Sequence, residues 1–223
     1  MYSQQYFTSE DSVCFSRGSS DTRRSYHLVK RPLDLSLVLL ASPVVIPLIL
    51  ILALLIALDG GKPFYSQTSI GRNGRAYRMW KLRSMVHDAD ERLISFLVAN
   101  PGARSEWDLT QKLHDDPRVT RFGRILRACS LDELPQLWNV IRGDMSLIGP
   151  RPMLPGQQAL YEGRAYYRLR PGLTGLWQAC ARNRSSFAAR VAYDERYEDE
   201  MGLMSDLQIL IQTVLVVLRR TGC

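Results

Sequence analysis

An uncharged, apolar run near the N-terminus restricts this chain more than any other feature. Residues Leu35 to Leu58 lie between Asp34 and Asp59 and carry no charged side chain. As a straight helix, the run would be roughly 36 Å long at about 1.5 Å per residue, enough to cross a bilayer. It is too long and begins too late for a signal peptide, and no small-residue cleavage site follows it. The sequence therefore predicts a membrane segment.

The flanks and the prolines of this run bear on its topology. Basic residues precede it (Arg23, Arg24, Lys30, Arg31) and follow it (Lys62, Arg72, Arg75, Arg78, Lys81, Arg83). Because basic flanks favour the cytoplasmic side, a single crossing does not suit both ends. Pro43 and Pro47 each remove a helical hydrogen bond, and the Ser42 hydroxyl can satisfy a freed carbonyl. Two topologies stay open: a re-entrant helix–break–helix over residues 30–60 and a kinked spanning helix.

The remaining chain contains several local patterns. Residues 1–29 are polar and predict a flexible cytoplasmic arm. Phe64 to Arg83 predicts a β-hairpin with Asn73-Gly74 at its turn, and the surrounding Gly71-Arg72-Asn73-Gly74 lacks the Lys-Ser/Thr ending of a phosphate loop. A helix is predicted from about Val86 to a stop at Asn100-Pro101-Gly102.

The second half of the chain adds a basic run, an acidic group and an apolar stripe. Arg118, Arg121, Arg124 and Arg127 form either a solvated helix face or a surface for phosphates or lipid headgroups. The acidic residues Asp194, Glu195, Glu198, Asp199 and Glu200 predict a solvated helix face. Apolar residues at helical spacing from Leu207 to Leu218 predict an amphipathic helix. It is too short to span a bilayer, so it either packs on the core or lies in the membrane interface.

Charge and composition narrow the partners. The net charge of +7 suggests an anionic partner, which includes nucleic acid, a membrane surface and a phosphorylated small molecule. No motif that reads nucleic acid is present. The four cysteines (Cys14, Cys129, Cys180, Cys223) and the three histidines are scattered, which argues against disulfides and zinc. If the protein uses a metal, carboxylates must hold it, which favours Mg²⁺.

The stretch from Ser130 to Asn139 carries the main candidate site. Ser130 and Glu133 have the spacing of a capping box, and Pro135 fits a first helical turn, so a helix is expected to begin between Ser130 and Asp132. The helix dipole would then keep Asp132 ionised and available as an oxygen nucleophile. The alternative is that both acidic residues only cap the helix.

Taken together and in order, these motifs resemble those of the bacterial sugar transferases, the monotopic polyprenyl-phosphate phosphoglycosyl transferases. The matching segments are Lys30-Arg31-x-x-Asp34, Ser42-Pro43, Gly71 to Gly74, Lys81 to Met85, Asp116 to Thr120, Leu131 to Asn139, Gly143 to Pro152, Pro171 to Gln178 and Arg182-Asn183. The segment from Glu106 to Arg118 is similar to the galactosyl-1-phosphate transferases that initiate exopolysaccharide synthesis.

The resemblance implies a reaction and a set of site residues. A hexose-1-phosphate, with galactose or glucose favoured, would pass from a UDP-sugar to undecaprenyl phosphate with release of UMP. Asp132 would be the nucleophile that carries the phosphosugar, and Glu133 would help to hold Mg²⁺. The remaining matched positions are basic and would contact substrate phosphates or nucleotide: Lys81, Arg83, Arg151 and Arg182.

The resemblance also implies a fold and a location. It favours a helix-rich α/β (α+β) monotopic enzyme on the cytoplasmic face of the bacterial inner membrane, among its phospholipids. Residues 61–223 would form the catalytic domain, and Lys30, Arg31, Ser42 and Pro43 would form the anchor and break of the re-entrant segment. The chain lacks the transmembrane helices of longer relatives, so a minimal member is expected.

Two positions depart from the pattern, and one rival function remains. Ser69 stands where an arginine is usual, and Ala181 stands where a glycine usually precedes Arg182. The loss of one basic group at Ser69 is expected to weaken a contact with lipid or substrate without affecting the nucleophile. The rival is a non-catalytic scaffold that holds anionic lipid on its basic face. Such a scaffold would need the charge and the apolar segment but not Asp132 beside Glu133.

Overall fold

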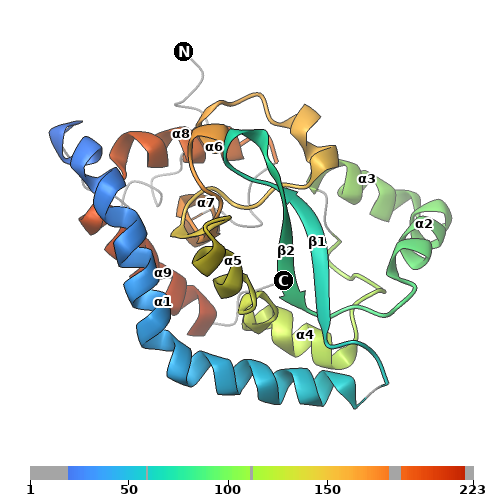
Figure 1. Ribbon diagram of the computed structural model, residues 1–223. Coiled ribbons are helices and arrows are strands. Elements are labelled where there is room, and N and C mark those ends of the chain that lie inside the picture. The colour runs from blue at the N-terminus through green and yellow to red at the C-terminus, as the bar shows by residue number, and fades with distance from the viewer. Residues whose placement is uncertain (1–19, 59, 111–112, 181–186, 219–223) are drawn as a thin grey trace.

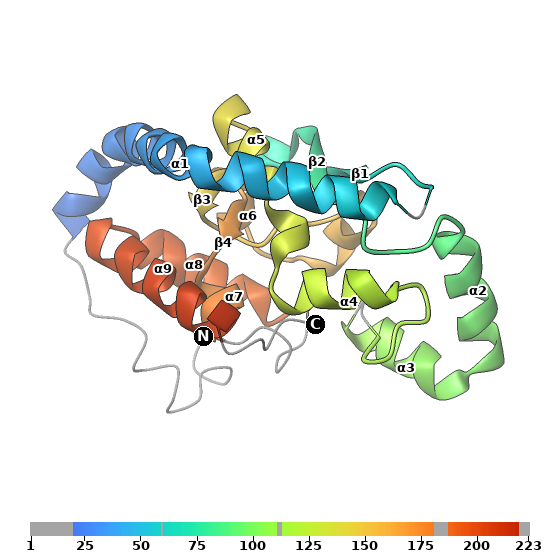
Figure 2. The same ribbon diagram turned by 90° about the horizontal axis from the view of Figure 1, so that it is seen from below.

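The computed structural model describes residues 20–58, 60–110, 113–180 and 187–218. A long N-terminal helix, α1 (Ser20–Ala57), lies along one side of a mixed domain with a central β-hairpin. Figure 1 shows α1 running down one edge of the domain, changing direction, and continuing beneath the hairpin and α4. Figure 2 shows that its second half covers the domain from one side.

The helix α1 is bent rather than interrupted. It continues through Pro32, Pro43 and Pro47, so the helix is not interrupted where a helix–break–helix was predicted. The Ser42 hydroxyl donates to the Leu39 carbonyl at 2.7 Å, the carbonyl that Pro43 cannot serve. This bond confirms the expected compensation and explains why helical geometry survives the prolines. The helix also begins at Ser20, so residues 20–29 of the predicted arm are helical, whereas residues 1–19 lie outside the described residues.

One face of α1 packs against the domain and the opposite face is exposed. Val38 joins a buried cluster with Met79, Val140 and Met145, and Leu52, Ala53 and Ile56 join another with Leu82 and Leu126. The outer face exposes large apolar side chains: Leu39, Leu40, Val44, Ile46, Leu50, Ile51, Leu54 and Leu55. By length and composition, Tyr26–Ala57 is long and apolar enough to cross a membrane.

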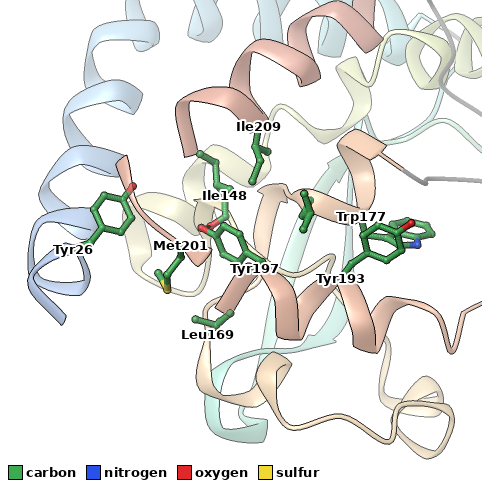
Figure 3. Close-up of a cluster of buried hydrophobic side chains, with 9 residues drawn as sticks. Tyr26, Ile148, Leu169, Trp177, Tyr193, Tyr197, Met201 and Ile209 are labelled. Carbon is green, nitrogen blue, oxygen red and sulfur yellow. Dashed lines mark hydrogen bonds between the residues drawn. The ribbon is translucent and has the colours of Figure 1, made fainter. Parts of the chain in front are cut away.

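The first half of α1 is fixed to the C-terminal helices. Lys30 forms an ion pair with the buried carboxylate of Asp206, which also accepts hydrogen bonds from the hydroxyls of Tyr26 and Tyr197. Figure 3 shows Tyr26 and Tyr197 as members of a cluster of buried side chains that also contains Ile148, Met201 and Ile209. Arg31 donates to the carbonyls of Val140 and Ile141 near the end of α5. The described contacts of Lys30 and Arg31 therefore join the helix to the domain, and their membrane role stays a prediction.

The predicted hairpin is confirmed. Strands β1 (Phe64–Ile70) and β2 (Ala76–Leu82) pair antiparallel from Phe64 with Leu82 to Ile70 with Ala76. The short turn η2 (Arg72–Gly74) carries positive φ at Asn73 (59°) and Gly74 (73°), the left-handed geometry that these two residues tolerate. Ser69, a position that departs from the family pattern, belongs to β1 and is fully buried.

A second, parallel pair of strands was not predicted. Strands β3 (Ser146–Ile148) and β4 (Gly172–Thr174) pair where the chain backbones approach closely. A Cβ on Gly172 would lie 2.1 Å from the Gly149 nitrogen, so glycine is required for this contact.

Short helices complete the domain. They are α2 (Ala89–Ala99), α3 (Pro101–Thr110), α4 (Arg121–Ala128), η3 (Leu131–Glu133), α5 (Gln136–Arg142), η4 (Pro155–Leu160), α6 (Ala165–Arg168), α7 (Leu176–Cys180), α8 (Arg190–Glu200) and α9 (Leu203–Leu218). The stop predicted at Asn100 is confirmed, but Pro101 also opens α3, because proline fits a first helical turn.

The C-terminal helices correct one prediction and resolve another. Asp194 on α8 is buried and accepts a hydrogen bond from the Tyr161 hydroxyl at 2.9 Å, so the prediction of a solvated face is wrong for this residue. The prediction is confirmed for Glu195 and Asp199, which are exposed. The predicted amphipathic helix is confirmed as α9, but its apolar stripe is turned outward: Leu207, Ile211, Val214 and Leu215 are exposed. This exposure favours the interfacial alternative over packing on the core.

Candidate active site

Asp132 lies in a tight turn between α4 and α5. Residues Leu131–Glu133 form the 3₁₀ turn η3, and α5 begins only at Gln136. Ser130 adopts a left-handed conformation (φ 55°) and its side chain makes no capping hydrogen bond, so the predicted capping box is wrong. The turn places the Asp132 side chain, which is 6% exposed, inside the domain rather than on the first turn of a helix.

The net shift of the Asp132 pKa is upward, against the expectation that a helix terminus favours its ionised form. Burial raises the pKa of Asp132, and the charge of Lys81 opposes this shift; the charge of Glu133 raises the pKa further, whereas that of Arg127 lowers it. Lys81 lies 3.0 Å from a Glu133 carboxylate oxygen. Asp132 is therefore a buried carboxylate whose charged neighbours, Lys81, Glu133 and Arg127, are partly exposed.

The elements that carry this group are fixed by tertiary hydrogen bonds. The fully buried side chain of Asn139 on α5 accepts from the Trp80 amide at 3.1 Å and donates to the Arg78 carbonyl at 2.7 Å. The Asn139 amide therefore occupies the hydrogen-bonding groups of β2 that a neighbouring strand would otherwise use, next to Lys81. On the other side, Arg127 donates to the Ser84 hydroxyl at 3.0 Å, just beyond the end of β2.

The close approach of α4 to the hairpin depends on Gly123. A Cβ there would lie 2.0 Å from the Ser84 carbonyl oxygen. Glycine at this position therefore allows α4 to carry Arg127 toward Asp132.

The other predicted basic residues do not all gather at Asp132. Arg83 bonds the Ile56 carbonyl at the end of α1 and the His87 ring. Arg83 therefore links the end of the hairpin to the membrane segment. Arg182 lies outside the described residues.

Arg151 belongs to a second group that contains residues missed from the sequence. Its guanidinium lies 5.7 Å from the centre of the Trp177 ring, and the buried guanidinium of Arg190 lies 4.5 Å from that ring. Burial lowers the pKa of Arg190 to about 9, with the Arg151 charge contributing. Trp177 had a signal, because it stands in the Gly-Leu-Trp-Gln motif, but no local pattern marks Arg190.

The donor set suits a metal that shares its coordination with a substrate. Among the described residues, no group of three or more His, Cys, Asp or Glu side chains is close enough to hold a metal. Asp132 and Glu133 nevertheless supply two adjacent carboxylates. Mg²⁺ commonly uses one or two carboxylates together with substrate phosphates and water, so these residues fit it.

Chemically, the site combines a buried carboxylate with neighbouring positive charge. A buried carboxylate beside Lys81 and Arg127 suits attack on phosphorus, because phosphoryl transfer depends mainly on positioning and on compensation of negative charge.

Comparisons with known proteins agree with the motifs. The family described as bacterial sugar transferase matches residues 25–220. The chain is 41% identical over 219 residues to the UDP-galactose-lipid carrier transferase of Erwinia amylovora, covering 97% of this chain and 46% of the relative. It is 46% identical over 198 residues to exopolysaccharide production protein ExoY of Rhizobium meliloti, covering 87% of this chain and 88% of the relative.

A third relative carries a different sugar in its name. The UDP-glucose:undecaprenyl-phosphate glucose-1-phosphate transferase of Caulobacter vibrioides is 39% identical over 203 residues, which cover 86% of this chain and 70% of the relative. The chain thus spans about half of the Erwinia relative and most of ExoY. From the family match and these identities, the chain belongs to the bacterial sugar transferase family.

Proposed function

We propose that the protein transfers a hexose-1-phosphate from a UDP-sugar to undecaprenyl phosphate at a membrane surface, as the first membrane step of exopolysaccharide synthesis. The observation that carries the proposal is the buried Asp132 carboxylate between Lys81, Glu133 and Arg127. The family match supports the reaction class, and the relatives named for galactose and glucose transfer support those two sugars as donors.

The proposed reaction has two displacements at one phosphorus atom. An Asp132 oxygen attacks the sugar-bearing phosphorus, the bond to the bridging oxygen breaks, and UMP leaves with that oxygen and its electron pair. An oxygen of undecaprenyl phosphate then attacks the same phosphorus and releases the Asp132 carboxylate. The product is undecaprenyl diphosphate sugar, and water takes no part. Dividing the transfer lets each bulky anion meet Asp132 in turn.

Positive charge around the phosphorus comes from this chain and from Mg²⁺. Lys81 and Arg127 already act on the Asp132 charge, so they are placed to compensate charge that moves onto phosphate oxygens. Glu133 would hold Mg²⁺ with the donor diphosphate, and the ion would neutralise charge on the departing phosphate. Arg151, on the Trp177 ring, and Arg182 complete the basic set proposed from the motifs.

The membrane segment is proposed to be re-entrant, with both ends on the cytoplasmic side of the inner membrane. The bend of α1, its basic flanks and its exposed apolar outer face support this topology. The exposed stripe of α9 supports a further contact with the membrane interface. In this arrangement, the acceptor phosphate meets Asp132 while its tail stays in the bilayer.

The first prediction tests the nucleophile. The full chain in detergent or nanodiscs, with UDP-galactose or UDP-glucose and undecaprenyl phosphate, should release UMP in the presence of Mg²⁺. Asp132→Asn should abolish release, because the neutral amide is a poor nucleophile, while membrane association persists. Intact-mass measurement without acceptor should detect the phosphosugar adduct on the unaltered protein only.

Asp108→Asn is a matched control, because it removes the same charge at an exposed position outside η3. Asp108 forms its ion pair with Arg104 on α3. Unchanged turnover in Asp132→Asn would refute the covalent mechanism. If the unaltered protein binds anionic membranes but no UDP-sugar in the panel yields UMP, the scaffold alternative is favoured.

A further inference from the structure

A basic cavity lies at the turn end of the hairpin. It has a volume of about 220 Å³ and is enclosed by the first half of α1, the turn η2 and the segment that follows α6. Its charged walls include Lys30, Arg31 and Asp34 from α1, Arg72 from η2, and Arg168 and Arg170.

Two of these cations have local carboxylate partners. Lys30 is paired with Asp206, and Arg168 with Glu198 at 2.6 Å. The guanidiniums of Arg31, Arg72 and Arg170 then face the single carboxylate of Asp34 among the described lining residues. The three arginines carry two positive charges more than Asp34 compensates.

The electrostatics of Arg170 show that these arginines act on one another. Burial lowers the pKa of Arg170, and the charges of Arg31 and Arg72 lower it further, with Asp34 opposing them. Like charges that converge in a partly buried cavity repel each other, and an anion bound between them would remove this repulsion.

Two of the three arginines are held in place by backbone carbonyls. The Arg170 Nε donates to the Gly143 carbonyl at 3.0 Å, and one terminal nitrogen of Arg31 donates to the Ile141 carbonyl at 2.9 Å. Neither bond neutralises a charge. Guanidiniums fixed in this way lose little freedom when they bind an oxyanion, and their planar donors suit phosphate.

The cavity is separate from the candidate active site. Arg72 lies in the turn of the hairpin, whereas Lys81 pairs with Tyr65 near the open end. Five residue steps along β2 from Ala76 to Lys81 cover about 17 Å, so one phosphate cannot contact both Arg72 and Asp132.

We propose that this cavity binds a phosphate group, held by Arg31, Arg72 and Arg170, at a second site distinct from Asp132. The phosphate belongs either to a lipid headgroup or to a small soluble molecule. The lipid source is consistent with the position of the cavity beside the first half of α1, whose residues Leu28 and Val29 are exposed.

The test measures binding to the full chain in neutral detergent. Thermal unfolding is followed with increasing inorganic phosphate, and separately with short-chain phosphatidic acid, against chloride at matched ionic strength. Arg72→Gln is the test variant, because Arg72 is exposed in the turn. Arg75→Gln is the matched control, since Arg75 is an exposed arginine of the same loop that does not line the cavity. Arg72→Lys restores the charge.

We expect both the unaltered protein and Arg75→Gln to show saturable stabilisation, and Arg72→Gln to bind at least tenfold more weakly, with partial recovery in Arg72→Lys. Stabilisation by inorganic phosphate equal to that by phosphatidic acid identifies a soluble source, and a stronger effect of phosphatidic acid identifies a lipid. No stabilisation by either, or equal weakening in Arg72→Gln and Arg75→Gln, would overturn the proposal.

Discussion

At the scale of the residue, the balance of forces on Asp132 decides the chemistry. Burial raises the pKa of its carboxyl group, and the Lys81 charge is the largest influence that opposes this shift. A carboxylate that is costly to ionise is more basic, and a more basic oxygen is a better nucleophile once ionised. In the proposed mechanism, the Lys81 charge favours the ionised form of Asp132 that attacks phosphorus, while burial preserves the basicity of that carboxylate.

The Lys81 charge leads to a prediction about pH. In Lys81→Met the opposing charge is lost, so the pKa of Asp132 rises further. Protonation removes the nucleophile, so the acid limb of kcat/KM should move to higher pH, with activity recovering as pH increases. The measurement is the pH profile of UMP release, with Lys62→Met as a control on an exposed lysine. An acid limb that stays in place would contradict this account of Lys81.

From the sequence, the residues of this candidate site could be predicted, but the backbone geometry around them could not. Asp132, Glu133 and Lys81 were all predicted, because motifs mark them. The capping box was wrong because Ser130 adopts a left-handed conformation that its own sequence spacing does not reveal. Arg127 belongs to a basic run with two open interpretations. Its hydrogen bond to Ser84 and the effect of its charge on the Asp132 pKa distinguish it from the exposed Arg121 and Arg124.

At the scale of the element, one amide holds α5 against the hairpin. The Asn139 side chain meets both the Trp80 N–H and the Arg78 carbonyl. Removing it leaves two part-buried backbone groups without these side-chain partners, each at a cost in the lower half of the range of about 1–3 kcal/mol for an unsatisfied group. The segment that carries Asp132 and Glu133 therefore depends on a contact made outside it.

We predict that Asn139→Ala lowers the free energy of unfolding by about 3 kcal/mol, on the basis of these two lost partners. Thermal unfolding of the full chain in detergent provides the measurement. Asn100→Ala is the control, because the exposed Asn100 amide serves only a carbonyl near the end of α2 and its loss should cost less than about 1 kcal/mol. Equal losses in the two variants would show that the contact between α5 and β2 contributes little.

Elements with a recognisable local sequence pattern were predicted. Strands that form only through contacts between segments distant in sequence were not. The hairpin has a turn pair and alternating apolar residues, and α9 has an apolar repeat, so both were found. Strands β3 and β4 have three residues each, and the two strands come from segments far apart in the chain. Such short strands leave no periodic pattern, and their pairing depends on close backbone approach at Gly149 and Gly172.

At the scale of the whole molecule, the arrangement of apolar surface relates the domain to the bilayer. The outer face of α1 and the stripe of α9 both expose large apolar side chains. The sequence predicted the apolar segments but left two topologies open. Figure 1 shows that α1 changes direction and continues beneath the domain, a bend that supports the proposed re-entry.

The topology can be tested with a single cysteine. In a background where the four native cysteines are serine, Lys62→Cys places a thiol at an exposed position after α1. A re-entrant segment keeps this thiol on the cytoplasmic side, so a membrane-impermeant reagent added to intact cells should not label it. Labelling after the cells are permeabilised is the control for reactivity. Reaction in intact cells would instead support a spanning helix.

The packing of the inner face of α1 has a consequence for biogenesis. Val38, Leu52 and Ile56 complete interior clusters of the domain, so deleting the anchor would strip Met79, Leu82 and Leu126 of their covering. A soluble fragment that retains an intact core cannot be obtained by trimming the N-terminus. We therefore expect the domain to fold only once α1 is in place, and α1 leaves the ribosome before its interior partners because it precedes them in the chain.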